Sequence, residues 1–234
     1  MIVYGRNPVR EALRGRRRVQ RVFATDRAAH DVWLGEIEAQ IVDDHEIRER
    51  CGSPDHQGIC AEVQAYPYAD PDSLLDDDDA LILCLDEVQD PHNLGAVCRV
   101  AEVGGCAGVV LPERRSAEVT PAVCRASAGA VEHLAVARVR NLADWLRSAK
   151  EREAWVYGAA SDAKVPYHRP DYRGRVVLVL GSEGRGLRAR VAAECDELVH
   201  LPARGRVGSL NVSTAAAALV YGILHFRAAL DRAP

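Results

Sequence analysis

Two short segments of this chain are apolar at every position. Residues 81–85 read Leu-Ile-Leu-Cys-Leu, and residues 176–180 read Val-Val-Leu-Val-Leu. A strand presents alternate side chains to opposite faces of its sheet, so a strand without polar residues must be buried on both faces. Sheets of this kind are mostly parallel and carry helices on each side. The two segments therefore predict an α/β fold around a mostly parallel sheet, with helices on both faces.

Other segments extend this α/β pattern along the chain. Strands are predicted where apolar and β-branched residues cluster, and helices where apolar residues recur with a period near 3.6. A helix that starts at Asn7 has Asn7 as a possible N-cap and Pro8 at its first position. The predicted C-terminal strands are 81–86, 108–111, 134–139, 155–159, 175–180 and 197–201, and the helices are 93–104, 120–128, 141–151, 187–193 and 212–230. The N-terminal part adds strands at 19–24 and 59–65 and helices near 31–40 and 45–51.

A polar segment separates these two parts of the chain. Residues 66–80 contain two prolines and a run of four aspartates, which repel each other and favour a solvated spacer over a metal site. A length of 234 residues suits one or two domains. We therefore predict a small α/β domain at 1–66, an acidic linker at 67–80 and a larger domain at 81–234.

Charge is distributed unevenly over these parts. The formal net charge of −4 argues by itself against a nucleic-acid partner. Residues 1–30, however, hold eight arginines against two acidic residues, whereas residues 31–80 hold fifteen acidic residues against two arginines. Residues 81–234 hold twenty basic and seventeen acidic residues. The acidic middle therefore masks a basic N-terminal arm.

Cysteine and histidine are frequent but scattered. The seven cysteines and eight histidines form no Cys-x-x-Cys or His-x3-His pair, so no metal site is expected. Several cysteines lie in apolar runs, where a thiol serves as a small core residue. The longest apolar stretch, 215–226, is shorter than the roughly 20 residues that span a bilayer, and the N-terminus lacks a signal-peptide core. We expect a cytoplasmic protein without a membrane segment.

Three segments combine polar or glycine residues with the ends of predicted strands, where ligands bind in α/β sheets. The first, residues 85–99, contains Asn93 and Arg99, which would project in different directions from a regular helix. Taken alone, Asn93 could simply cap the helix and Arg99 could be a surface cation. The second, residues 181–187, reads Gly-Ser-Glu-Gly-Arg-Gly-Leu and fits neither a dinucleotide fingerprint nor a P-loop.

The third segment, residues 201–218, is a glycine-rich loop that enters an alanine-rich helix. Ser209 or Asn211 can cap this helix, and its small side chains allow close packing by another helix or a second copy of the chain. Glycines at strand-to-helix turns also let a ligand approach the backbone.

In order and spacing, the three segments resemble the motifs of the SpoU (TrmH) family of S-adenosylmethionine-dependent RNA ribose 2′-O-methyltransferases. The N-terminal part is similar to the substrate-binding domain of the branch that methylates guanosine in 23S rRNA. The residues that carry the first resemblance are Asn93, Gly95, Arg99, Gly181, Glu183, Gly184, Gly186, Ser209, Leu210, Asn211, Ser213 and Ala216. The second rests on residues 4–13, Tyr-Gly-Arg-Asn-Pro-Val-Arg-Glu-Ala-Leu, and on residues 56–59, His-Gln-Gly-Ile.

This resemblance implies a fold and a set of roles. The larger domain would carry a deep trefoil knot of the SPOUT type, and the smaller would be a ribosomal-protein-like RNA-binding domain. Arg99 would grip an RNA phosphate and stabilise the developing alkoxide, because a guanidinium resists deprotonation. Asn93 and Glu183 would orient Arg99 and the ribose, and Ser209 and Asn211 would complete the catalytic site. S-adenosylmethionine would bind at Gly181, Leu201 and Leu210.

The resemblance also implies partners. The family works as a homodimer, and its substrate is RNA, with rRNA favoured over tRNA by the N-terminal domain; neither DNA nor a membrane is expected. RNA contacts are predicted from the basic arm, at Arg6, Asn7, Arg10, Arg16, Arg17 and Arg18, with Arg14 and Arg21 on the same arm.

Three alternatives remain open at this stage. A tRNA ribose methyltransferase would share all motifs of the larger domain. A non-catalytic RNA-binding or resistance factor of the same fold is disfavoured because Asn93, Arg99 and Glu183 are all present. A nucleotide-binding oxidoreductase is disfavoured by the missing dinucleotide fingerprint.

Overall fold

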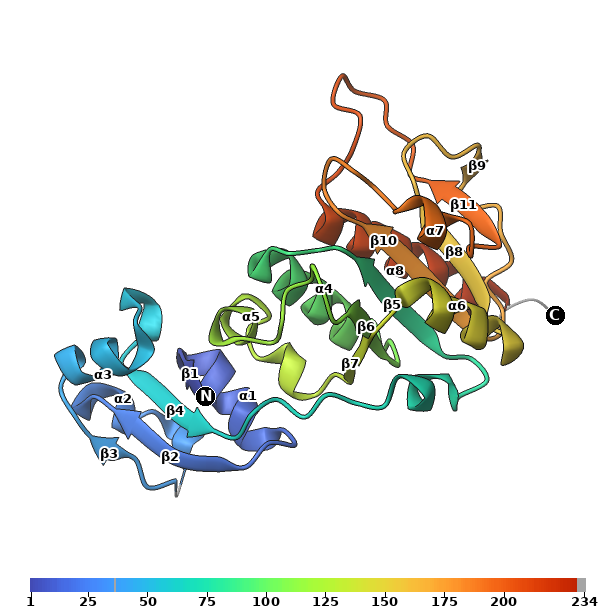
Figure 1. The fold of residues 1–234 in the computed structure, drawn as a ribbon. Helices are drawn as coiled ribbons and strands as arrows, with labels where there is room; N and C mark the ends of the chain where they lie inside the picture. The colour runs from blue at the N-terminus through green and yellow to red at the C-terminus, as the bar shows by residue number, and fades with distance from the viewer. Residues whose placement is uncertain (36, 231–234) are drawn as a thin grey trace.

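The described part of the chain forms two β-sheets, a small one at the N-terminus and a large one built from the residues that follow (Figure 1). The computed structural model describes residues 1–35 and 37–230. The small sheet has the order β1-β4-β2-β3, and β4 runs antiparallel to β1 and β2. Its strands are β1 (Ile2–Tyr4), β2 (Val19–Ala24), β3 (Gln40–Ile41) and β4 (Ile59–Val63), and the helices of this unit are α1 (Arg6–Arg14), α2 (Asp26–Ala29) and α3 (Asp44–Cys51).

Two local predictions for the small unit are wrong. The segment predicted as a helix near 31–40 forms a single 3₁₀ turn at Val32–Leu34 and then the edge strand β3; residue 36 of that segment lies outside the described residues. Asn7 does not cap α1, because the helix begins at Arg6 and Gly5 occupies the N-cap position. The Arg6 backbone N–H instead donates to Gln57 Oε1 at 2.9 Å, so a side chain distant in sequence replaces the predicted cap.

The large sheet confirms the predicted parallel architecture. Its order is β7-β6-β5-β10-β8-β11-β9, and every neighbouring pair is parallel. The two-residue strand β9 was not predicted, because two residues give no periodicity. The strands are β5 (Leu81–Asp86), β6 (Gly108–Pro112), β7 (Val136–Val139), β8 (Trp155–Ala159), β9 (Val165–Pro166), β10 (Val176–Gly181) and β11 (Glu197–His200). The helices are α4 (Pro91–Val103), α5 (Pro121–Ala126), α6 (Leu142–Glu151), α7 (Ala189–Ala192) and α8 (Val212–Leu230).

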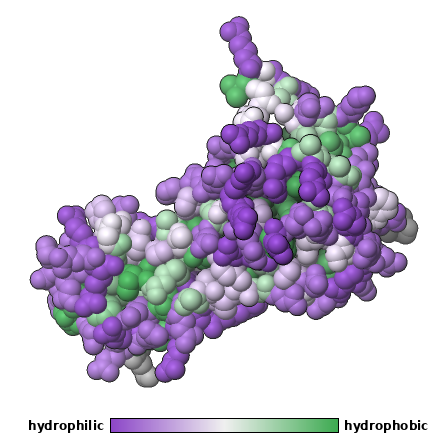
Figure 2. Space-filling model, viewed as in Figure 1, coloured by the Kyte–Doolittle hydropathy of each residue, from purple (hydrophilic) through white to green (hydrophobic). Residues whose placement is uncertain are grey.

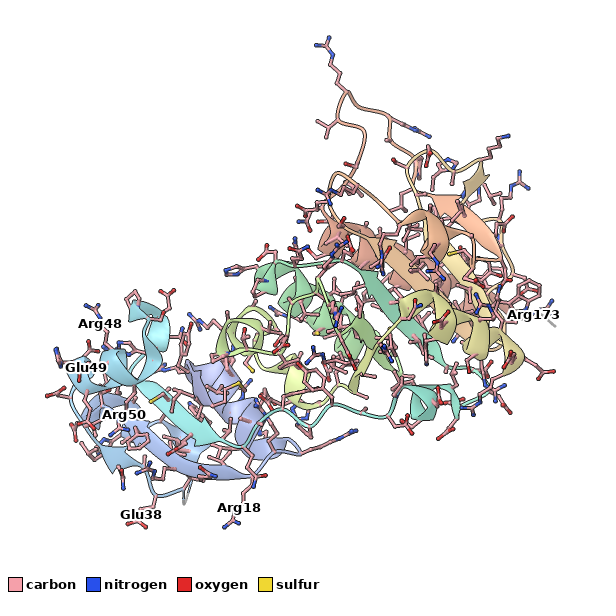
Figure 3. The ribbon with its side chains drawn as sticks, in the orientation of Figure 1. Arg18, Glu38, Arg48, Glu49, Arg50 and Arg173 are labelled. Carbon is pink, nitrogen blue, oxygen red and sulfur yellow. The ribbon has the colours of Figure 1, made fainter. Side chains whose placement is uncertain are left out.

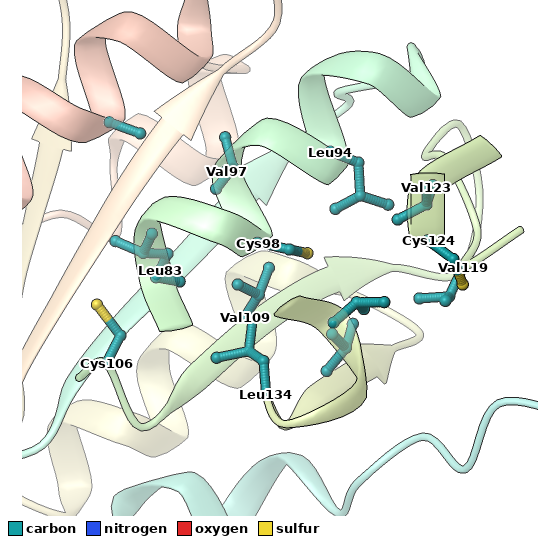
Figure 4. Packing of buried hydrophobic residues seen from close by; sticks show 14 of the residues in the cluster. Leu83, Leu94, Val97, Cys98, Cys106, Val109, Val119, Val123, Cys124 and Leu134 are labelled. Atoms are coloured by element: carbon teal, nitrogen blue, oxygen red, sulfur yellow. The ribbon is translucent and has the colours of Figure 1, made fainter. Parts of the chain in front are cut away.

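Alternate residues of the apolar strands enter two different cores. Val176, Leu178 and Leu180 pack with α4, α5 and α8 in one cluster, which also contains buried residues of the small unit. Val177 and Val179 pack with α6 on the opposite face. Figure 4 shows the first core, where side chains of α4 interdigitate with those of α5 and β6. The uninterrupted apolar runs are therefore explained by burial on both faces, as predicted.

Helix α8 is long and apolar enough, by length and composition, to cross a membrane. The shorter apolar stretch 215–226 is thus not sufficient to exclude a span. In the structure α8 packs against α4 and β10. It buries Ala216, Leu219, Val220 and Ile223 on that side, so its place in the core accounts for part of its apolar composition.

The acidic segment between the sheets is more closely packed than predicted. Its four aspartates, 76–79, are exposed, but the 3₁₀ turn Pro71–Leu75 buries Leu74 and Leu75 in the second core. Arg152 donates to the Asp72 carbonyl at 2.6 Å and pairs with Asp76 at 3.1 Å. The aspartates are solvated as expected, whereas the turn before them adds two leucines to the second core.

A buried ion pair joins the small unit to the large one. The Arg17 guanidinium makes a two-point contact with the Glu132 carboxylate, including Nε to Oε2 at 2.8 Å, and the two side chains are 1% and 0% exposed. Burial alone would lower the pKa of Arg17, but the bond to Glu132 raises it above its ordinary value. The prediction that Arg17 contacts RNA is therefore wrong. Its neighbour Arg18 points away from the body of the small unit (Figure 3).

Further contacts cross the same boundary. The Tyr66 hydroxyl lies 3.0 Å from the Val131 carbonyl oxygen and 2.7 Å from that of Leu134. The Glu11 carboxylate lies 2.9 Å from His133 Nε2. Gly129 has φ +89°, and a Cβ there would lie 2.6 Å from Glu11 Cβ, so glycine allows α1 to approach this turn. Together these contacts fix the small unit against the large one.

We expect Glu132→Ala to lower the free energy of unfolding by about 3–5 kcal/mol, because it leaves the Arg17 charge buried without a partner. The double variant Arg17→Met, Glu132→Leu should recover much of this loss, since it removes both charges. Urea unfolding measures both effects. The matched control is Glu62→Ala, which breaks the more exposed pair with Arg21 and should cost less than about 1 kcal/mol. Equal losses in Glu132→Ala and Glu62→Ala would contradict the expectation.

Candidate functional site

The candidate site lies where the strand order of the large sheet reverses. Strands β5 and β10 are neighbours although their paired residues lie 95 positions apart in sequence, and Gly181 pairs with Asp86 at their carboxyl ends. Strands β6 and β7 lie on the β5 side of this pair, and strands β8, β11 and β9 lie on the β10 side. A crevice outside the strand ends at such a reversal is the usual ligand site of α/β sheets.

Three polar side chains from the three motif segments meet at this edge. Asn93 Nδ2 donates to Glu183 Oε1 at 3.1 Å. Asn211 Nδ2 lies within hydrogen-bond distance of both Glu183 Oε1 (2.5 Å) and Asn93 Oδ1 (2.9 Å). Asn93 follows β5, Glu183 follows β10 and Asn211 ends the loop after β11. The structure therefore brings together three residues that the motifs had only suggested to be neighbours.

Helix capping leaves the amide of Asn93 free for this network. Helix α4 begins at Pro91, and the Asp90 carboxylate caps it by accepting from the His92 backbone N–H at 2.9 Å. The simpler interpretation, that Asn93 caps this helix, is therefore wrong. Asn211, in contrast, does both tasks: its Oδ1 accepts from the Ser213 backbone N–H at 2.9 Å, while its amide group reaches Glu183.

A buried carboxylate holds the end of the glycine-rich segment. Asp86 is 0% exposed, and its oxygens accept from the Arg188 backbone N–H at 2.8 Å and from Arg188 Nε at 2.7 Å. Glu87 is nearly buried and pairs with both Arg188 and Arg115. Asp86 and Arg188 were not among the predicted site residues; the signal in the sequence was a charged residue, Asp86, at the end of an apolar strand.

The segment after β10 folds back tightly on its own strand. Ser182 forms a bridge with Gly186, and a Cβ on Gly181 would lie 2.1 Å from the Gly186 carbonyl carbon. Only glycine fits at position 181 without moving this turn. Gly184 and Gly186 have φ of +81° and +67°, where glycine avoids backbone strain. The turn presents Glu183 to the other two segments.

The other predicted site residues lie outside the hydrogen-bonded network. Arg99 is exposed on α4 and makes no side-chain hydrogen bond or ion pair within the described residues. Ser209 and Leu210 are exposed on the loop between β11 and α8, and Leu201 is half-buried at its start. This loop protrudes from the large unit in Figure 1, and its tip is hydrophilic in Figure 2.

The predicted RNA contacts differ in their surroundings. Arg6 pairs with Asp31 at 3.1 Å, and Arg10 pairs with Glu11 at 2.8 Å. Asn7, Arg16 and Arg18 are exposed on the same unit, whereas Arg17 is buried as described above.

Thiol chemistry does not fit this site. Burial raises the pKa of the Cys98 thiol, next to Arg99, and of the Cys124 thiol on α5, each to about 12. Both thiols stay protonated near neutral pH, and a protonated thiol is a poor nucleophile. The arrangement instead offers amide, carboxylate and guanidinium groups, which position a substrate and stabilise charge without forming a covalent bond.

Comparison with known families fits this geometry. A sequence profile described as the SpoU rRNA methylase family matches residues 80–221, more than half of the chain. The chain belongs to the SpoU rRNA methylase family. A second profile, RNA 2′-O ribose methyltransferase substrate binding, matches residues 2–69. Family membership confirms the resemblance drawn from the motifs, and with it the broad prediction of an RNA methyltransferase.

Individual relatives agree with this membership. Bacillus subtilis YacO, named as a TrmH-family tRNA/rRNA methyltransferase, is 36% identical over 96% of this SpoU-family chain and 95% of its own length. A Synechocystis protein named as a tRNA/rRNA methyltransferase is 37% identical, but the chain spans only 62% of its length. The 23S rRNA (guanosine-2′-O-)-methyltransferase RlmB of Pseudomonas syringae is 41% identical over 74% of the chain and 72% of its own length.

Solved structures agree on the fold. The SpoU methyltransferase AviRb of Streptomyces viridochromogenes, crystallised with the cofactor AdoMet, superposes with a TM-score of 0.81 at 23% identity over 97% of this chain and 90% of its own. This likeness confirms the α/β fold with its seven-stranded parallel sheet.

We expect Gly181→Ala to lower the free energy of unfolding by about 1–3 kcal/mol, because the added methyl group must displace the turn at Gly186. Gly205→Ala is the matched control, since a Cβ there meets nothing within 4 Å; it should change stability by less than about 0.5 kcal/mol. Urea unfolding of both variants provides the comparison. If the two variants were equally stable, the close approach at Gly181 would not constrain this turn.

Proposed function

We propose that this chain transfers a methyl group from S-adenosylmethionine to a ribose 2′-hydroxyl of RNA, in guanosine of 23S rRNA. The observation that carries the proposal is the contact among Asn93, Glu183 and Asn211, which joins the three motif segments at the strand-order reversal. The match of residues 2–69 to a ribose methyltransferase substrate-binding domain supports the 2′-hydroxyl as target. The 41% identity to an RlmB enzyme supports the 23S rRNA guanosine.

The two loops beside the network fit an adenosine-containing cofactor. Residues 203–210 donate no backbone hydrogen bond to any described residue, so their N–H groups can meet the polar edge of a purine. Leu201 and Leu210 add an apolar surface, and Leu210 is 53% exposed. When bound, S-adenosylmethionine supplies an electrophilic methyl group on a positively charged sulfur. Gly181, Leu201 and Leu210 would hold it, as the resemblance implies.

The chain's own residues then have to position the ribose 2′-oxygen and stabilise the negative charge that develops on it. The Asn93–Glu183–Asn211 contacts fix the carboxylate of Glu183 toward the other two loops, which orients the ribose. Arg99 keeps all five guanidinium N–H donors free of described partners, so it can bind a phosphate next to the reacting sugar. Its positive charge also stabilises the alkoxide that develops as the hydroxyl proton leaves. A guanidinium group resists deprotonation, so Arg99 does not act as the base.

One assay tests this proposal. The chain is incubated with labelled S-adenosylmethionine and separate 23S rRNA and tRNA transcripts, and the labelled nucleotide is mapped. We expect 2′-O-methylguanosine in 23S rRNA from the wild-type chain, and a loss of about 10²-fold or more in rate from Arg99→Ala, with cofactor binding retained.

Arg169→Ala is the control for that assay, because Arg169 is an exposed arginine between β9 and β10 that the proposal does not use. Label in tRNA alone would transfer the proposal to a tRNA ribose methyltransferase. Label in neither RNA, or full activity of Arg99→Ala, would contradict the enzymatic role.

We also propose a homodimer formed through the large unit, with the loop after β11 threaded as the trefoil knot of the family. Exposed apolar side chains support the dimer: Val103 of α4 is 63% exposed and Tyr221 of α8 is 51% exposed. The two lie on adjoining elements, because a Cβ on Gly104 would contact Val220 at 2.8 Å. An apolar surface at this position suits a second copy of the chain.

Light scattering at micromolar concentration should give twice the mass of one chain. Tyr221→Glu should shift the protein toward the monomer, because it places a charge in the proposed interface. Val32→Glu is the control, since Val32 is 97% exposed on the small unit and far from α8 in sequence. A monomeric wild-type protein, or equal effects of the two variants, would refute this interface.

A further inference from the structure

A positive charge at the boundary between the two units has no acidic partner among residues 1–35 and 37–230. Arg125 lies on α5, which packs against both β1 of the small unit and α4 of the large one (Figure 1). Its Nη1 donates to Gln57 Oε1 at 3.2 Å, and this neutral amide is the only side-chain partner that Arg125 has within the described residues. Other boundary arginines, Arg6 and Arg17, are paired with carboxylates.

The backbone around Arg125 is shaped to hold its guanidinium at this boundary. Gly5 has φ +92°, and a Cβ there would lie 2.7 Å from Arg125 Nη1. Gln57 has φ +55° and accepts from both Arg125 and the Arg6 backbone N–H. Gly5 and Gln57 belong to the two N-terminal segments that resemble a substrate-binding domain. In the structure these segments meet the large unit at Arg125.

Helix α5, which carries Arg125, adjoins the candidate site. Gly95 follows Asn93 by two residues on α4, and a Cβ on Gly95 would lie 2.5 Å from Ala126 Cβ and 2.9 Å from the Ser127 nitrogen. The α4 and α5 backbones are therefore in close contact near Asn93, and Arg125 precedes Ala126 directly. Arg99, also without a partner in the described part of the chain, lies further along α4.

We propose that Arg125 binds a phosphate of the RNA backbone, so that the substrate RNA runs from the small unit across α5 to the site on α4. The inference rests on the proposed function and adds a contact point that lies in neither the basic arm nor the catalytic motifs. One guanidinium donor is used by Gln57, and the remaining donors and the full charge are available to a phosphate. The partner class is a phosphodiester chain, recognised by charge and not by base sequence.

The test measures RNA binding to the full-length chain as a function of salt, between about 50 and 200 mM, with the 23S rRNA transcript as probe. We expect Arg125→Ala to weaken binding by about threefold to tenfold and to reduce the slope of log K against log salt by about 0.7 to 0.9. Arg125→Gln, which keeps a donor for Gln57, should reduce the slope of log K against log salt by the same amount. Arg125→Lys should retain the slope, because it retains the charge.

Gln57→Ala is the control, because it removes this hydrogen bond, together with the one from the Arg6 backbone N–H, and leaves the charge of Arg125 in place. A merely structural role of Arg125 predicts equal effects of Gln57→Ala and Arg125→Ala, with unchanged slopes, and that result would overturn the inference. Thermal unfolding of each variant reports its fold, and Arg125→Gln replaces Arg125→Ala if the latter unfolds.

The outcome also separates this inference from the proposed function. Methyl transfer by the wild-type chain together with an unchanged slope in the Arg125 variants would overturn the RNA contact alone. A reduced slope in those variants without any methyl transfer by the wild-type chain would overturn the enzymatic proposal alone. Wild-type binding that does not depend on salt would overturn the phosphate contact.

Discussion

The parallel pairing of β5 with β10 is the contact on which the rest of the structure depends. It places Gly181 opposite Asp86, and two of the three polar segments of the site begin at these two residues. Asp86 then accepts from Arg188 and holds the far end of the turn that starts at Gly181. A one-residue shift in this register would turn the side chains of β10 to opposite faces and exchange the two cores.

The site is thus built from residues that follow the ends of strands. Glu183 comes from the turn after β10, and Asn211 returns from β11 through an exposed loop of about ten residues. Hydrogen bonds among amides and a carboxylate position these segments without burying an unpaired charge, which would be costly. Arg99 stays outside this network, and its charge is not paired with any side chain that the structure describes. Such an arrangement suits a reaction in which substrate positioning and charge stabilisation do most of the catalysis.

The boundary between the two units has an unusual division of charge. Arg17 and Glu132 neutralise each other in the interior, where a single charge would be destabilising, whereas the half-buried Arg125 has, among the described side chains, only a neutral amide as its partner. The first 30 residues contain eight arginines, and their sequence alone does not distinguish an arginine that stabilises the fold from one that can bind RNA. Arg17 and Arg18 are adjacent in sequence, yet one is buried and the other points to solvent.

Local patterns in the sequence determined the elements of the large sheet and the three segments that carry the site. A strand with an uninterrupted apolar run must be buried on both faces, and apolar residues with a helical period mark each connecting helix. The longer strands and helices of residues 81–230 were therefore predicted with small errors in their first and last residues. Short elements without periodicity, such as β3 and β9, were missed. The prediction that Asn7 caps its helix was wrong because Gln57, fifty residues later, supplies the acceptor.

Only the tertiary structure decided that Asn93 meets Asn211 across 118 residues, that Arg17 is buried and that Arg125 lies at the boundary. Such contacts depend on the path of the whole chain, which no local period or spacing encodes.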